Sequence, residues 1–169
     1  MTDANSSATW ADQTLAIMAA GWSAYQDQLI TALARLDAEQ LELRATPGLR
    51  SIRENATHVV SVRANWFHQA LEVGDEAFAA FGAWQLPDAP PRTAEELVTG
   101  LRETWRVMTE ALAGWSSADL AATVEGVRRG QPFSLVRGWV VWHVMEHDLH
   151  HGGEISYALG MYSLPGVDI

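Results

Sequence analysis

Four of the six histidines of the chain lie within nine residues, from His143 to His151. Within this group His147 and His151 are four residues apart, so on a helix they would share one face about 6 Å apart along the axis. Imidazoles on adjacent helical turns can reach one divalent metal ion, which is how His-x-x-x-His pairs serve zinc enzymes. This pair is the first candidate for chemistry.

A metal site needs at least a third ligand, which must come from another element. His58 is the candidate, because it lies near the start of an expected helix. His68 lies on the same helix but projects about 80° away from His58. Three neutral imidazoles would leave the ion its full charge and an open coordination position, as a catalytic site requires.

The same residues also allow an interpretation without a metal. A His-x-x-x-His pair arises by chance, and a helix can carry exposed histidines or buried, hydrogen-bonded ones. Acidic neighbours favour the metal, because Glu146, Asp148 and Glu154 could accept hydrogen bonds from the rings and orient them. Spacing alone does not decide between the two interpretations.

Other polar residues could take part in a site. Asn65 follows His58 by seven residues and faces the same way, so it could contact a ligand or be a surface asparagine. Glu146 could act as a base or be a solvated carboxylate, and Trp84 could line a pocket mouth. Four arginines could bind substrate carboxylates, although the sequence places none near the histidines: Arg53, Arg63, Arg128 and Arg129.

Four segments have apolar residues at helical spacing, and they are expected to form helices over residues 10–36, 52–73, 94–112 and 135–159. Their start signals are Thr9 with Asp12, Ser51 with Glu54, Thr93 with Glu96, and Ser134. Residues 82–91 hold three of the six prolines and predict a loop, whereas residues 116–132 fit an irregular loop or a short hairpin. The pattern predicts an all-α fold, a four-helix bundle in a single domain over residues 1–169.

Composition narrows the class of protein. Hydrophobic residues make up 48% of the 169 residues, which is enough for a core. The net charge of −10 without a basic stripe argues against nucleic acid and anionic membranes as partners. The absence of cysteine excludes disulfides and a cysteine nucleophile. The N-terminal residues lack a signal-peptide pattern and no apolar run reaches eighteen residues, so a cytoplasmic location is expected.

Two segments resemble motifs of the DinB-like superfamily. Residues 142–155, WHVMEHDLHHGGEI, resemble its C-terminal helix motif, and residues 51–60, SIRENATHVV, resemble its second-helix motif with a single histidine. The resemblance covers most of the chain in length, helix order and both motifs. It implies a four-helix bundle with DinB-like non-sequential connectivity.

The resemblance also implies a divalent ion, such as zinc, nickel or iron, bound by His58, His147 and His151. His143 and His150 flank the pair and are not ligands in that pattern, although with Asn65 and Glu146 they could contact the ligands or a substrate. Gly152 stands where many members have an arginine, so the chain lacks at this position the side chain that could bind an anionic substrate.

Members of this superfamily include transferases and isomerases that use bacillithiol, mycothiol or glutathione. The resemblance therefore predicts an enzyme that activates a low-molecular-weight thiol for transfer to a small electrophile or for isomerisation. The thiol would arrive with the cosubstrate, so the chain needs no cysteine of its own. The alternative is a non-catalytic, stress-related helical protein that binds a metal or a small molecule. A homodimer is expected in either case.

Overall fold

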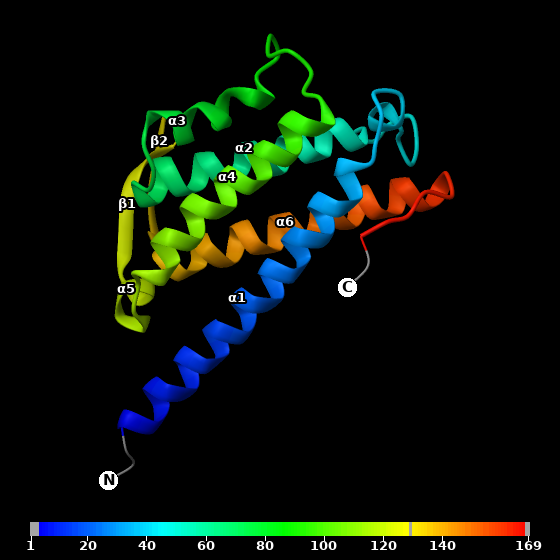
Figure 1. Cartoon of the computed structure of the whole chain (residues 1–169). Coiled ribbons are helices and arrows are strands. Elements are labelled where there is room, and N and C mark those ends of the chain that lie inside the picture. Colours follow the sequence, from blue (N-terminus) through cyan, green and yellow to red (C-terminus); the bar gives the residue numbers. More distant parts are fainter. Residues whose placement is uncertain (1–3, 129, 168–169) are drawn as a thin grey trace.

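Four long helices form the body of the protein in the computed structural model, which describes residues 4–128 and 130–167 (Figure 1). They are α1 (Ala4–Ala34), α2 (Ile52–Leu71), α4 (Ala94–Ala113) and α6 (Arg137–Met161). Shorter helical segments lie between them: η1 (Gln40–Glu42), α3 (Glu76–Ala80), η2 (Phe81–Gln85) and α5 (Ser117–Ala121). The chain is therefore mostly helical, as expected, and residues 82–85 of the predicted loop are part of a 3₁₀ helix.

Local capping chemistry sets the start of two long helices. Ser51 and Thr93 each begin a helix with a capping box. The side chain of the cap residue accepts from the backbone N–H three residues later, and the carboxylate of Glu54 or Glu96 accepts from the backbone N–H of the cap residue. These two predictions are confirmed. The predicted start of the first helix is wrong, because α1 begins at Ala4 and Thr9 lies inside it.

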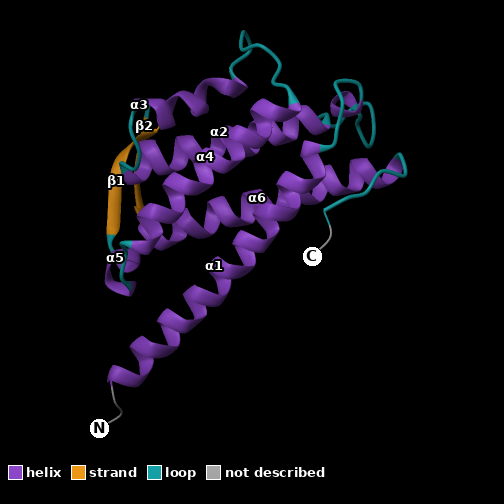
Figure 2. Ribbon diagram, viewed as in Figure 1, coloured by secondary structure: helices purple, strands orange, loops and turns teal. Residues whose placement is uncertain are grey.

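The segment before α6 corrects both the all-α prediction and the predicted cap at Ser134. Strands β1 (Thr123–Arg128) and β2 (Gln131–Val136) pair antiparallel, so Ser134 is held in a strand opposite Glu125. The helix α6 begins only after Val136, without a side-chain cap. Of the two interpretations of residues 116–132, the hairpin is the correct one. It lies across the end of the helices, against α2 and α6 (Figure 2).

The long helices pack around two apolar clusters. Helix α2 contacts both α4 and α6, and α1 runs obliquely across α4 and α6. One cluster includes Leu33, Val60 and Ile155, and the other includes Trp22, Phe67 and Met108. Burial of these side chains is the main force that holds the four helices together.

A layer of buried polar residues is also shared by these helices. Arg63 on α2 forms an ion pair with Asp148 on α6 at 2.7 Å, and both side chains have no exposed surface. Trp22 on α1 donates to the same carboxylate oxygen at 2.7 Å, and Arg63 also donates to Gln26 at 2.6 Å and to the Leu101 carbonyl at 3.2 Å. We call these residues the ion-pair layer; it ties α1, α2, α4 and α6 together.

Within the described part of the chain, no helix combines the length and apolar character that crossing a membrane requires.

Candidate metal centre

Three histidines from two helices meet beside the ion-pair layer. His58 comes from the second turn of α2, and His147 and His151 come from successive turns of α6. The Nε2 atoms of His58 and His147 lie 3.1 Å apart, and one ring nitrogen from each of the three residues lies within 4.8 Å of the others. The helices α2 and α6, which pack directly on each other, thus bring the three predicted residues to a common point.

Neighbouring side chains fix the orientation of the two outer rings. His58 Nδ1 contacts Gln85 Oε1 at 2.7 Å, and His151 Nδ1 contacts Glu154 Oε2 at 2.7 Å. Because an amide oxygen and a carboxylate only accept hydrogen bonds, both Nδ1 atoms carry the proton and donate it. Each ring then keeps the lone pair of Nε2 free. This pattern is the usual support of metal-binding histidines.

Burial keeps the three rings neutral. It is the main cause that lowers the pKa of His58 and His151 below the ordinary 6.5, although the hydrogen bonds of Gln85 and Glu154 oppose the shift. Burial, together with the neighbouring histidines, lowers the pKa of His147 to about 2. A metal can therefore bind the rings without displacing protons from them near neutral pH.

The spacing of the nitrogen atoms fits a metal ligand set. A tetrahedral zinc with bonds of about 2.1 Å separates its ligand nitrogens by about 3.4 Å. The 3.1 Å between His58 and His147 is close to this value, and the nitrogen of His151 lies within 4.8 Å of both. The buried Nδ1 of His147 has no hydrogen-bond partner among the described residues, so none of them fixes its proton.

The flanking histidines have other neighbours. His143 stacks on Trp139 with ring centroids 5.1 Å apart, and its ring lies 6.2 Å from that of His147. His150 lies 3.4 Å from Glu154, beside His151. The predicted helper Glu146 is exposed and lies 3.8 Å from His143. These flanking residues all lie on α6, whereas the contact of His147 with His58 comes from α2.

Two further candidates are engaged elsewhere. Asn65 donates to the Gly82 carbonyl at 3.3 Å and accepts from Gln69 at 3.0 Å, so it fastens η2 to α2. Asp148 does not orient an imidazole, as the sequence suggested, because its carboxylate pairs with Arg63 in the ion-pair layer. Burial raises the pKa of Asp148, and the charge of Arg63 opposes that rise.

Most of the arginines considered for substrate binding are also occupied. Arg63 is buried in the ion-pair layer, Arg53 pairs with Glu42 at 2.6 Å, and the guanidinium of Arg128 lies 3.9 Å from the centre of the Trp66 ring. Arg129 lies outside the described residues. Arg53, Arg63 and Arg128 therefore offer no free guanidinium to the histidine site.

Close packing explains the small residue at position 152. Gly152 faces Tyr25 of α1, and a Cβ built on this glycine would collide with the Tyr25 ring and hydroxyl. The Tyr25 hydroxyl donates to the Leu149 carbonyl at 3.3 Å, and burial raises its pKa to about 12. The tyrosine thus occupies the space that a side chain at position 152 would need.

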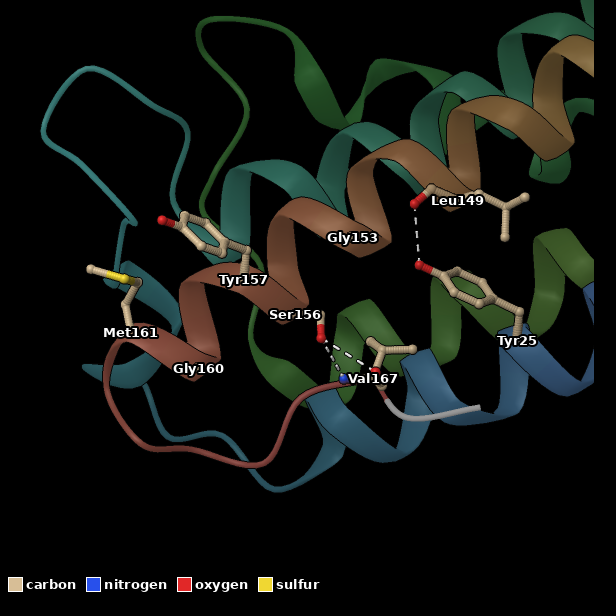
Figure 3. Close-up of a pocket in the computed structure, with 8 residues that line it drawn as sticks. All are labelled: Tyr25, Leu149, Gly153, Ser156, Tyr157, Gly160, Met161 and Val167. Carbon is tan, nitrogen blue, oxygen red and sulfur yellow. Dashed lines mark hydrogen bonds between the residues drawn. The ribbon is translucent and has the colours of Figure 1, made fainter.

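Two cavities lie near the site, one beside α2 and the other beside α6. One, of about 560 Å³, is lined by His58 together with Trp84, Gln85 and two arginines, so Trp84 lies at a pocket as predicted. The other, of about 670 Å³, lies along the opposite side of α6 beside Tyr25 and Tyr157 (Figure 3). None of the three histidines lines this second groove, so the first is the cavity next to the site.

Sequence reasoning missed two residues at the site, Gln85 and Arg50. Gln85 follows Trp84 in η2, and it reaches His58 only because η2 packs along α2. Arg50 shares the cavity with His58. The available signal was position: Arg50 directly precedes Ser51, the first residue of the motif that carries His58.

The fold and the site define a helical protein with a three-histidine cluster between two packed helices. The family model of the DinB family matches residues 9–160, so this chain belongs to the DinB family. A DinB-like protein from Bacillus cereus ATCC 10987 is similar in structure, with a TM-score of 0.69 and 19% identity over 90% of this chain and 95% of that one.

A conserved protein from Enterococcus faecalis shares the fold more distantly. The TM-score is 0.55 with 10% identity, and the match covers 86% of this chain and 94% of the other. Among curated proteins, no sequence matches this chain. At these identities the solved structures establish the fold alone.

Proposed function

We propose that this DinB-family protein binds one divalent metal ion through the Nε2 atoms of His58, His147 and His151. The observation that carries the proposal is the convergence of three neutral rings, two of them oriented by Gln85 and Glu154. Imidazole ligands suit zinc, nickel and iron alike. A four-helix bundle of α1, α2, α4 and α6, with non-sequential connectivity in a single domain, is our interpretation of the framework.

We further propose that the site activates a low-molecular-weight thiol, of the bacillithiol, mycothiol or glutathione type, for transfer to a small electrophile or for isomerisation. When bound, the ion would supply the positive charge that lowers the pKa of the thiol. The residues of the chain position that chemistry: three uncharged rings leave the charge undiminished, and Glu154 and Gln85 hold the rings in place. The chain itself contains no thiol that could compete.

Elemental analysis of the purified protein tests the metal site. We expect about one equivalent of metal in the wild type and in His68→Ala, whose ring contacts the Val73 carbonyl at the end of α2. We expect His147→Ala to lose it. A wild type without stoichiometric metal, or a His147→Ala variant that holds as much as the wild type, would rule out the site.

Thiol consumption tests the activity. The metal-loaded protein is incubated with each of the three thiols and an electrophile such as 1-chloro-2,4-dinitrobenzene. A rate above that of the metal-free protein supports a transferase. Full occupancy by metal without any metal-dependent rate would instead favour the alternative, a non-catalytic binding protein.

That alternative has an observation of its own. An apolar cavity of about 400 Å³ lies between α1, α4 and α6, with Trp22, Trp105 and Trp142 in its walls. Such a cavity suits a small apolar ligand. Quenching of tryptophan fluorescence by apolar ligands, unchanged in His147→Ala, would support binding that is independent of the histidines.

We also propose a homodimer. Leu15, Ile17 and Met18 expose 38%, 73% and 40% of their surface along α1, and a row of exposed apolar side chains on one helix is typical of an interface. Light scattering should give twice the mass of the chain for the wild type, and Ile17→Glu should shift the mass toward the monomer. A monomeric wild type at micromolar concentration would contradict this. We further propose that the protein is located in the cytoplasm.

A further inference from the structure

The cavity beside His58 has polar walls and the size of a small-molecule site. Its volume is about 560 Å³, within the range of roughly 300–1,000 Å³ that is common for such sites. One wall is the segment that leads into α2, and the other is η2 with the proline-rich segment after it. The charged residues of the walls are Glu42, Arg50, Arg53 and Glu54.

Both carboxylates of this cavity already have an arginine partner. Glu42 accepts from Arg53 at 2.6 Å, and Glu54 binds Arg44 through two hydrogen bonds of 2.7 and 2.8 Å. Arg53 also donates to the carbonyl of Ala38 at 3.1 Å. Within each pair the two charges neutralise each other, and the guanidinium groups of Arg44 and Arg53 donate to groups within the protein.

Arg50 is different. Its guanidinium is exposed and forms no hydrogen bond or ion pair with any residue in the ranges 4–128 and 130–167. Among the described arginines only Arg102, on α4, shares this property. In a chain with a net charge of −10, the cavity therefore keeps one uncompensated cation beside a histidine of the site.

The charge of Arg50 also reaches the whole histidine cluster. It contributes to the lowered pKa values of His58, His147 and His151, and it lowers the pKa of Glu154 as well. Arg50 and His58 line the same cavity, so the guanidinium lies on the side of the protein where His58 faces that cavity. One small ligand could therefore face Arg50 and the histidines at once.

We propose that Arg50 is a specificity-determining residue, which binds the carboxylate of a small ligand whose other end reaches the three histidines. The inference rests on the proposed function, because the ligand is the thiol or its acceptor. The planar guanidinium suits a carboxylate through two parallel hydrogen bonds. The Trp84 ring forms a flat wall of the same cavity.

The test compares ligands that differ only in the carboxylate. The cobalt-loaded protein is titrated with 3-mercaptopropionate and with the neutral 3-mercapto-1-propanol, and binding is followed by the sulfur-to-cobalt absorption band. We expect the wild type to bind the carboxylate thiol about five- to tenfold more tightly. Arg50→Ala should reduce this preference to parity, and Arg50→Lys should keep part of it.

Arg102→Ala is the matched control, because it removes the same charge from another unpaired arginine on α4. It should leave the preference unchanged. Equal binding of the two thiols by the wild type, or a preference that survives in Arg50→Ala, would overturn the inference while the metal and thiol proposals stand.

A second ligand pair separates this inference from the proposed function. If neither thiol produces the absorption band, thiol activation fails, and calorimetry with succinate and the neutral succinamide then decides the role of Arg50. Tighter binding of succinate that is lost in Arg50→Ala supports a carboxylate site. Equal binding of the two compounds overturns it.

Discussion

His147 and Asp148 are neighbours in α6, yet they belong to two buried polar regions of opposite kind. Asp148 lies in the ion-pair layer, where its charge is matched by Arg63 and by the Trp22 indole. His147 lies in the histidine cluster, where its Nε2 faces another Nε2 and its Nδ1 has no partner within the described chain. The two side chains point about 100° apart around the helix axis, so adjacent residues of α6 enter two different regions. In the ion-pair layer opposite charges are paired, and in the histidine cluster they are not.

The comparison teaches how function can be distinguished from architecture among buried polar groups. In the ion-pair layer donors meet acceptors and opposite charges meet, so the protein alone satisfies most of its needs. In the histidine cluster, like groups converge, and each would repel the others if protonated. Such an arrangement suits a cation from outside the chain, so we expect the two regions to respond differently to mutation.

The largest effect on stability should come from the ion-pair layer. Arg63→Ala leaves the Asp148 carboxylate buried without its cation, which should lower the free energy of unfolding by about 3–5 kcal/mol. Urea denaturation of the metal-free protein measures this change. The exposed Arg106, paired with Glu103 and Glu110 on its own helix, is the control, and its alanine variant should leave stability nearly unchanged. Similar values for both variants would contradict the comparison.

The corresponding change in the histidine cluster should act through the metal. His147→Ala should lower the stability of the metal-free protein by about 1 kcal/mol or less, because its Nδ1 has no partner among the described residues and the polar contact that is lost is the one between its Nε2 and His58. For the wild type, metal at a hundredfold excess over its Kd should add about 2.7 kcal/mol, and the variant should lose this gain. Thermal unfolding with and without zinc measures both quantities. A large loss of stability without metal would make His147 an architectural residue.

A smaller effect is expected from the residues that orient the rings. Glu154→Gln weakens the acceptor for His151 Nδ1 and should raise the Kd for zinc about tenfold. Glu146→Gln is a matched control on the same helix, because Glu146 lies beside His143. Competition with a zinc chelator measures both values. Equal affinities for the two variants would show that Glu154 does not support the site.

The smallest effect should appear in the pH dependence of the metal-free protein between about pH 6 and 7, where each ring shifts the free energy of unfolding by less than about 1 kcal/mol. Burial lowers the pKa of His147 to about 2 and those of His58 and His151 below 6.5, so the folded chain binds fewer protons than the unfolded one. Stability that these rings contribute is therefore present above about pH 6.5 and is lost as the pH falls below it. Urea denaturation at several pH values should show a shallower dependence in His147→Ala, and identical slopes would contradict the assignment.

Local signals predicted part of this molecule from the sequence. The capping boxes at Ser51 and Thr93 depend on residues three positions apart, so they are readable without the fold. The spacing of His147 and His151 likewise places them on one face of α6. The partner element for these histidines came from the resemblance and from the position of His58, and the structure brings all three together.

The remaining features depend on contacts between distant segments. Arg63 and Asp148 are 85 residues apart, and nothing near either residue indicates that they pair. Ser134 has a side chain that suits a helix cap, but the pairing of β2 with β1 placed it in a strand. Gln85 reaches His58 across 27 residues through the packing of η2 on α2. Such contacts are fixed by tertiary packing rather than by local propensity.

The close approach of Tyr25 to Gly152 limits which amino acids can replace either residue, both in redesign and in evolution. Positions 25 and 152 share one volume, so neither can change size freely without the other. An arginine at position 152 would first require a small residue at position 25, and the reverse order would pass through an overpacked helix pair. The two positions should therefore be exchanged together, as a single coupled replacement between α1 and α6.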